Sequence, residues 1–362
     1  MKNRFRAPGR VCLFGEHQDY LGLPVIAAAI DKYIFIDSEP LTEKKYEIRR
    51  PNLIDFPFEF EINEKELTYG KDRALNYLAA CYNLIKRKGA VFSHGRKWEL
   101  TGTIPINAGA SSSSAMVICA LLAFAHEGNV VHMIDPQKLA ILGYKAEVAE
   151  FGEAGGMMDH FASAFGGLIA METNPPMLIH HSPVDKVSLN IVLADSGVKK
   201  RTVEDLKCVK AAALESIQQI SKKIPDFNIY NTPKDIVFEY INDLPENLAK
   251  VLKGNIINRD ITQKVLAFLN NGDPITAQTI GPLILQHHKS LSEYVGVSIP
   301  KIDEMVEIAM DAGALGAKIN GSGFGGTMFA ICDKEPTNVK DALESHGFDS
   351  WIVTISPGAQ KF

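Results

Sequence analysis

The sequence predicts an α+β protein of two domains. The chain has 362 residues, more than one typical small domain contains. Its first half mixes short strands with helices, whereas its second half is mainly helical and closes with a strand, a helix and a strand. We place the boundary near residues 185–189, which divides the chain into domains 1–187 and 188–362.

The elements of the first domain follow from the apolar pattern and its breaks. Continuous apolar or β-branched runs indicate strands, and apolar residues three or four positions apart indicate helices. Residues 72–89 show the helical spacing at Leu75, Leu78, Tyr82 and Ile85, with Gly89 as a stop. In chain order we expect strands at 11–14, 25–40, 46–50 and 97–106, and helices at 72–89, 111–128 and 135–152.

The second domain shows longer helical patterns between a few strands. Proline, acidic residues and glycine mark several of the helix ends. In chain order we expect a strand at 189–197, helices at 203–224, 246–254, 273–296 and 300–314, a strand at 326–333, a helix at 337–347 and a strand at 350–357.

The composition is that of an ordinary soluble globular protein, with 46% hydrophobic and 22% charged residues. A net charge of −5 does not favour binding to nucleic acid or to an anionic membrane, and no protein partner is implied. No signal peptide is evident, and the longest apolar helical run, 115–125, is too short to span a bilayer. The five cysteines are odd in number and lack Cys-x-x-Cys spacing, so we expect buried free thiols and a cytoplasmic location.

A polar segment follows the first strand. Glu16, His17 and Asp19 lie within four positions after the apolar run 11–14, and Arg10 precedes that run. On its own, this pattern is typical of a strand end followed by a solvated turn. The alternative is a set of side chains that hydrogen-bond a ligand.

Four consecutive serines begin the next notable segment, "PINAGASSSSA" at 105–115. The start of a helix exposes unpaired N–H groups and the positive end of the dipole, and small residues let an anion approach. A Walker A loop is excluded because no lysine follows the glycine. One serine would suffice as a helix cap, so we favour a phosphate site. Its members would be Gly109, Ser111, Ser112, Ser113 and Ser114.

A glycine-rich segment, "KINGSGFGGTM" at 318–328, carries Gly321, Gly323 and Gly326 at Gly-x-Gly-x-x-Gly spacing. A dinucleotide-binding fold needs a strand before this pattern and a helix after it, whereas we expect a helix upstream and a strand downstream. A protein-kinase loop is excluded because no His-Arg-Asp or Asp-Phe-Gly follows. The segment is either a tight turn or backbone that lies close to a ligand.

A carboxylate in small and apolar surroundings marks the segment 145–167. Asp159 follows two glycines and two methionines, where it is either a helix cap or a functional group, and Glu147 lies on the preceding helix. We expect His160 to be a neighbour without direct chemistry. The pairs at 180–181 and 287–288 lack ligand spacing and are expected to be structural or exposed.

Together these segments resemble the GHMP small-molecule kinases, whose motifs occur in the same order. "APGRVCLFGEHQDY" most resembles the galactokinase segment, and "PINAGASSSSA", "GGMMDHFASAFGG" and "KINGSGFGGTM" resemble the other motifs. The resemblance implies an N-terminal domain like ribosomal protein S5 domain 2 and a ferredoxin-like C-terminal domain. It also implies an ATP-dependent sugar 1-kinase, with galactose as the expected substrate.

The resemblance also implies roles for single residues. Asp159 would accept or orient the proton of the attacking hydroxyl, assisted by Arg10. Mg²⁺, bound with ATP, would contact Ser113 and Glu147. The sugar would be held by Glu16, His17, Asp19 and Gly323.

Several positions depart from the galactokinase pattern. Cys12 replaces the usual Asn, and Gln18 replaces the usual Thr. Residues 21–23 replace Asn-Gly-Gly, and Asn107 replaces the usual Gly. Most of these changes surround the residues expected to hold the sugar, so kinase chemistry is better supported than galactose as the substrate. Another sugar, a uronic acid, homoserine or mevalonate remains an alternative substrate. A non-catalytic sugar sensor is the alternative from another class, which the retention of Arg10 and Asp159 disfavours.

Overall fold

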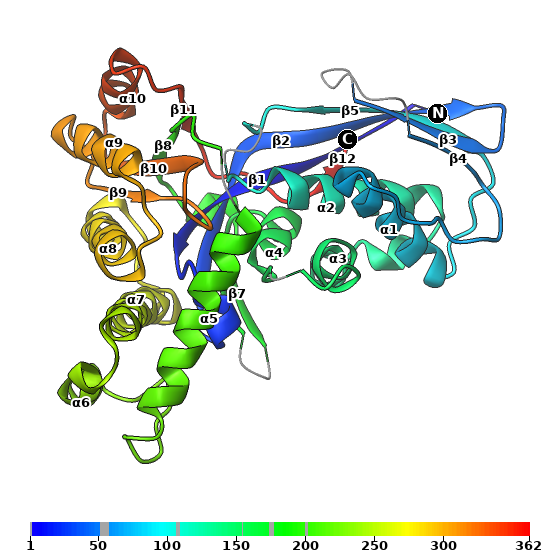
Figure 1. Cartoon of the computed structure of the whole chain (residues 1–362). Coiled ribbons are helices and arrows are strands. Elements are labelled where there is room, and N and C mark those ends of the chain that lie inside the picture. The colour runs from blue at the N-terminus through cyan, green and yellow to red at the C-terminus, as the bar shows by residue number, and fades with distance from the viewer. Residues whose placement is uncertain (1, 51–57, 106–108, 154, 174–176, 200–201) are drawn as a thin grey trace.

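A large sheet with helices packed on one face forms the first part of the molecule (Figure 1). The computed structural model describes residues 2–50, 58–105, 109–153, 155–173, 177–199 and 202–362, with side chains from 206 onward in the last range. Within these residues the sheet has eight strands, and all pairs except β3 with β5 are antiparallel. Its strands are β1 (Asn3–Phe14), β2 (Val25–Leu41), β3 (Lys45–Arg49), β4 (Phe58–Glu61), β5 (Gly95–Gly102), β6 (Leu168–Glu172), β7 (Leu178–Ser182) and β12 (Gln360–Lys361).

Over the described residues, four helices lie on one side of this sheet (Figure 1). The helix α2 (Ser112–Glu127) is buried along nearly its whole length because its sequence is apolar on every side. The helix predicted over 72–89 begins after Asp72, whose side chain accepts a hydrogen bond from the Leu75 amide as an N-cap. The four helices are α1 (Arg73–Arg87), α2 (Ser112–Glu127), α3 (Pro136–Tyr144) and α4 (Met158–Phe165), and α3 continues into a π-helical turn (Lys145–Ala149).

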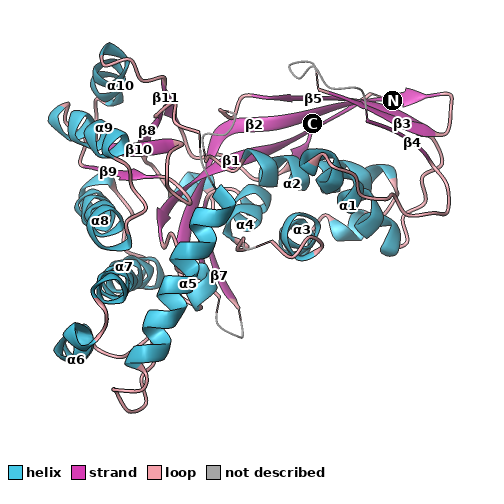
Figure 2. Cartoon of the chain, viewed as in Figure 1, coloured by secondary structure: helices cyan, strands magenta, loops and turns pink. Residues whose placement is uncertain are grey.

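A second, four-stranded antiparallel sheet follows in the other half of the chain, counted over the described residues. Helices cover one of its faces (Figure 2), and the first domain's core lies against the other. In β10 (Thr327–Cys332), one of its two inner strands, Phe329 and Ile331 join the first core, while Met328, Ala330 and Cys332 join the second. Its strands are β8 (Asn190–Asp195), β9 (Gly316–Ile319), β10 (Thr327–Cys332) and β11 (Ser350–Val353).

The helices of the second half pack beside this sheet and extend away from it (Figures 1 and 2). They are α5 (Thr202–Ile220), α6 (Lys234–Tyr240), α7 (Glu246–Asn271), α8 (Ala277–Ser290), α9 (Pro300–Asp311) and α10 (Pro336–Ser345). A π-helical turn (Leu291–Val295) extends α8. Among the described residues, no helix combines the length and the apolar character needed to cross a membrane.

Three expectations from the sequence are corrected. The helix predicted to stop at Gly254 runs on to Asn271, and a Cβ on Gly254 would come within 2.7 Å of Val295, so this glycine allows close packing rather than ending the helix. The glycine-rich segment follows a strand, β9, and not directly a helix, although a strand also follows it. Four cysteines are buried as expected, but Cys208 is exposed.

The C-terminal residues return to the first sheet. Strand β12 pairs with β1 in antiparallel register, with Phe5 opposite Lys361 and Arg6 opposite Gln360. Residues of both predicted domains therefore contribute to the first sheet, while the second sheet begins with β8.

Candidate active site

An ion pair joins β1 to the first turn of α4. The Arg10 Nε donates to Oδ1 of Asp159 at 2.7 Å and Nη2 donates to Oδ2 at 2.8 Å. Burial alone would raise the pKa of Asp159, but the charge and hydrogen bonds of Arg10 outweigh it and hold this pKa below its usual value. Asp159 therefore carries its charge at neutral pH, and its side chain remains 28% exposed and reachable by a ligand.

The serine-rich loop lies against the same pair. The third nitrogen of Arg10, Nη1, donates to the carbonyl oxygen of Gly109 at 2.7 Å, and the Ser111 hydroxyl donates to Oδ2 of Asp159. Ser111 adopts a left-handed conformation (φ 63°) and its side chain does not cap α2. The cap alternative is therefore wrong for Ser111, whose hydroxyl instead ties the helix start to the carboxylate. Asn107 lies outside the described residues.

A second carboxylate lies beside the start of α2. Oε2 of Glu147 is 2.7 Å from Nε2 of His160, and both side chains are buried. Burial would raise the pKa of Glu147, but His160 and hydrogen bonds from Ser113 and Ser114 together lower it. His160 thus has a hydrogen-bond partner in Glu147, and its lack of direct chemistry stays a prediction. The sequence carries no signal for this contact because the two residues lie on different helical segments.

The Glu147 carboxylate and the Ser113 hydroxyl fit Mg²⁺. Mg²⁺ takes hard oxygen ligands and commonly uses one or two carboxylates together with substrate phosphates and waters. The described residues include no group of three or more His, Cys, Asp or Glu side chains suited to a metal ion, so this pair would need phosphate oxygens to complete the shell. Ser113 is exposed at the helix start, where such phosphates would lie.

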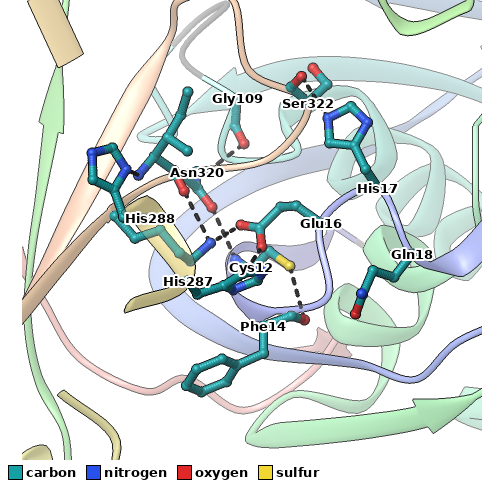
Figure 3. Close-up of polar contacts among 12 residues, drawn as sticks. Cys12, Phe14, Glu16, His17, Gln18, Gly109, His287, His288, Asn320 and Ser322 are labelled. Carbon is teal, nitrogen blue, oxygen red and sulfur yellow. Dashed lines mark hydrogen bonds and ion pairs between the residues drawn. The ribbon is translucent and has the colours of Figure 1, made fainter. Parts of the chain in front are cut away.

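The polar segment after β1 points its side chains in different directions. Asp19 lies against Gly156, where an added Cβ would fall 1.4 Å from the Asp19 Oδ2, so a side chain at position 156 would displace this carboxylate. Burial and the nearby charge of Asp159 raise the pKa of Asp19 to about 6. His17 makes contacts at both ring nitrogens. Its Nδ1 lies 3.2 Å from the Tyr20 hydroxyl, and its Nε2 lies 3.0 Å from the Ser322 carbonyl oxygen (Figure 3).

Glu16 differs from its neighbours because it is buried and paired. Its carboxylate accepts a hydrogen bond from the buried Lys318, which the sequence reasoning did not single out. Gly323 is also buried, and an added Cβ there would lie 2.4 Å from the Val297 carbonyl oxygen.

Asn320 connects three segments of the site (Figure 3). Its Oδ1 accepts from the backbone amide of Cys12 at 3.0 Å, and its Nδ2 donates to the Gly109 carbonyl and the Thr327 hydroxyl, both at 3.2 Å. The sequence reasoning missed Asn320 because an asparagine before a glycine is a common turn residue. The glycine-rich segment, the serine-rich loop and β1 are thus held together by one side chain.

Family models match three parts of the chain. Residues 76–167 match the GHMP kinases N terminal domain, and residues 274–349 match the GHMP kinases C terminal model. Residues 3–36 match the galactokinase galactose-binding signature. The galactokinase of Thermococcus kodakarensis is 30% identical over 336 residues, which cover 91% of this chain and 89% of that protein.

The chain belongs to the GHMP kinases. Kinases of this family are ATP-dependent phosphotransferases that act on hydroxyl groups, so this chain is a galactokinase-like phosphotransferase. The mevalonate kinase of Pyrococcus furiosus is also 30% identical, over 98% of this chain and 97% of that protein. A galactokinase and a mevalonate kinase therefore both align along almost the whole length of this chain.

Solved structures confirm the predicted α+β fold of the GHMP kinases. Lactococcus lactis galactokinase complexed with galactose has a TM-score of 0.85 at 24% identity. The alignment covers 100% of this chain and 95% of the galactokinase chain. Methanococcus jannaschii mevalonate kinase has a TM-score of 0.72 at 18% identity, covering 98% of each chain. At these identities the likeness concerns the fold.

Proposed function

We propose that this GHMP kinase transfers the γ-phosphoryl group of ATP to the anomeric hydroxyl of galactose. The observation that carries the proposal is the Arg10–Asp159 pair beside the serine-rich loop, next to a segment that matches the galactose-binding signature. Phosphoryl transfer asks a protein mainly to position groups and neutralise charge, and this arrangement supplies both.

Asp159 faces the attacking hydroxyl in this proposal. Because its pKa is lowered, it is a weak base in the ground state, so it first orients the hydroxyl through a charge-assisted hydrogen bond. It accepts the proton as the bond to phosphorus forms and the hydroxyl becomes acidic. Arg10 holds the carboxylate in place with two parallel hydrogen bonds and adds positive charge near the transferred group.

The phosphates of ATP lie at the start of α2 in this proposal. Gly109 and the serines 111–114 surround that helix start, whose free N–H groups and dipole favour anions. Glu147 and Ser113 would hold Mg²⁺, which neutralises phosphate charge when bound. His160 keeps the Glu147 carboxylate oriented through its 2.7 Å contact.

The sugar is held by the polar segment after β1. Asp19 offers a carboxylate acceptor to sugar hydroxyls, and the ring of His17 in the same segment is held by the Ser322 carbonyl. A sugar presents several hydroxyl donors, which suits carboxylate acceptors at a partly buried site. Gly323 would contribute its backbone to the wall of the site, since it has no side chain.

Mevalonate is the second candidate substrate, because mevalonate kinases align over nearly the whole chain at the same identity. The galactose-binding signature over residues 3–36 favours the sugar. A non-catalytic sensor is disfavoured since the carboxylates, the arginine and the serine-rich loop are all in place.

The deciding experiment measures ADP release by the purified protein with Mg-ATP and a panel of acceptors. The panel contains galactose, other hexoses, pentoses, uronic acids, homoserine and mevalonate. We expect the highest kcat/KM with galactose. A higher kcat/KM with mevalonate would replace the substrate, and no ADP release with any acceptor would overturn the kinase proposal in favour of a sensor.

A further inference from the structure

A buried amide fastens the polar segment after β1 (residues 15–23) to helix α7. Gln18 is fully buried, and its Nε2 donates to the Asn255 carbonyl at 3.0 Å. Its Oε1 lies 3.2 Å from the Thr262 hydroxyl, which donates to it. Figure 3 shows the side chains of His17 and Gln18 extending in opposite directions, so Gln18 faces α7 while His17 faces the glycine-rich segment.

The backbone of Gln18 organises the same segment. Its amide donates to the Gly15 carbonyl at 3.1 Å, and its carbonyl accepts from the amides of Leu21 at 3.0 Å and Leu23 at 3.1 Å. Gln18 is therefore held at its backbone by the turn and at its side chain by α7. Its two neighbours in the chain are residues proposed to hold the sugar, so their positions depend on where Gln18 is fixed.

Helix α7 carries a buried polar stripe at this contact. Asn255, Asn258 and Thr262 lie on one face at spacings of three and four, and each is at most 1% exposed. The single proton of the Thr262 hydroxyl is shared between Gln18 and the Asn258 carbonyl, which lies at 2.7 Å. Oδ1 of Asn255 and both polar side-chain atoms of Asn258 have no hydrogen-bond partner among the described residues. Apolar side chains would pack here at lower cost, so the stripe points to a role beyond packing.

Three departures from the galactokinase pattern belong to this one unit. Gln18, Leu21 and Leu23 stand at changed positions, and the Gln18 carbonyl joins the other two by hydrogen bonds. The usual threonine carries its hydroxyl on Cβ, two carbons short of the glutamine amide, so it would lose both contacts with α7. The changed residues are thus linked to each other and to α7.

We propose that Gln18 is a positioning residue that anchors the polar segment to α7, and that the changes at 18, 21 and 23 adapt this anchor and not the groups that contact the sugar. The proposal rests on the proposed kinase function for its kinetic effects. An anchored segment is ordered before the sugar arrives, so sugar binding does not carry the free-energy cost of ordering it.

Replacing Gln18 by methionine tests the anchor, because methionine keeps the length of the side chain and removes both hydrogen bonds. We expect Gln18→Met to raise the galactose KM roughly tenfold, with kcat and the ATP KM little changed. A purely structural role would lower the amount of active enzyme and therefore kcat, with both KM values unchanged. That result, or an unchanged galactose KM, would overturn the proposal.

Replacing Gln18 by the usual threonine separates an anchor from a change in sugar preference. We expect Gln18→Thr to lower kcat/KM for galactose about as much as Gln18→Met does, and by the same factor for other sugars that react. If Gln18 instead turned the site away from galactose, Gln18→Thr would raise kcat/KM for galactose relative to the other sugars. Such a rise would contradict the proposal.

A double-mutant cycle tests the partner on α7. Thr262→Val keeps the shape of the side chain and removes its hydroxyl, so it should raise the galactose KM less than Gln18→Met does. The double variant should match Gln18→Met, because the contact is already lost, whereas additive effects would mean that the two residues act independently. Thr262→Val also gives the kinetic comparison if Gln18→Met does not fold.

Hydrogen exchange gives a readout that does not depend on activity. We expect faster amide exchange in residues 15–23 of Gln18→Met than in the wild type. The matched control is Gln219→Met, which removes an exposed hydrogen bond to Glu215 on α5 and should leave exchange in 15–23 and the galactose KM unchanged. Unchanged exchange in 15–23 of Gln18→Met would refute the anchor, whereas a wild-type protein that phosphorylates no acceptor would refute only the kinase function.

Discussion

Replacing Asp159 by asparagine tests the centre of the proposed site. The carboxylate accepts two hydrogen bonds from Arg10, at 2.7 and 2.8 Å, and a third from the Ser111 hydroxyl. An asparagine has one carbonyl oxygen, whereas both oxygens of Asp159 accept from the guanidinium. Whichever way the amide is turned, its NH₂ group therefore faces a guanidinium donor. At least one bond from Arg10 is lost, and the buried guanidinium loses its counter-charge.

The expected loss in kcat is on the order of 10²-fold or more, the contribution of a positioned proton acceptor. A factor of 10² equals about 2.7 kcal/mol of transition-state stabilisation. The unmatched hydrogen bonds should lower the free energy of unfolding by about 1–3 kcal/mol. Sugar affinity should change little, because in the proposal Asp159 acts on one hydroxyl while other groups hold the ring.

The assay measures kcat by ADP release, the sugar Kd by calorimetry, and unfolding by heat at several pH values. Glu344→Gln is the control, since it removes one carboxylate from an exposed ion pair. The pKa of Asp159 is lowered in the folded protein, so the stability from its pair is present above the pKa of an unfolded Asp and is lost as the pH falls through the folded value. A kcat within a few-fold of wild type would refute the catalytic role, and a stability difference that grows toward acid pH would refute the ion-pair reasoning.

Three further outcomes are expected. Because the pKa of Asp19 is about 6, kcat/KM for the sugar should fall as the pH drops below about 6, and Asp19→Asn should remove that step in a pH–rate profile. Glu147→Gln should raise the Mg²⁺ concentration needed for half-maximal rate in a metal titration, with the sugar KM unchanged. Gly254→Ala should lower stability by about 1–3 kcal/mol in thermal unfolding, because the new Cβ would lie 2.7 Å from Val295, and an unchanged melting temperature would contradict the close packing of α7.

The sequence predicted the elements whose pattern is local and strong. Helix α1 has clear apolar spacing and an aspartate cap, and the structure confirms it within two residues of the expected bounds. Strand β9 was missed because four residues, Gly316–Ile319, are too few to show a period. Helix α7 was cut short because a glycine inside a helix looks like a stop until its packing partner is known.

The residues of the site also differ in how well the sequence predicts them. The family resemblance indicated both Arg10 and Asp159, and the structure brings them together across 149 positions. Glu16 and Lys318 meet across 302 positions, and a single lysine before a glycine-rich turn shows no sign of being buried. Contacts of this kind depend on how two domains pack, which local sequence pattern does not encode.

Three segments of the site share one backbone feature that links their stability. His17, Ser111 and Phe324 all have positive φ values, between 58° and 63°, although none is glycine. Such conformations cost on the order of 1–3 kcal/mol each and persist only where neighbouring groups enforce them. Here the enforcing contacts run between segments: His17 to the Ser322 carbonyl, Ser111 to Asp159, and the Phe324 amide to the backbone of residue 297. Each of these turns is therefore held by a contact outside its own segment. Because the His17–Ser322 contact joins the polar segment after β1 to the glycine-rich segment, loosening it should weaken the order of both segments.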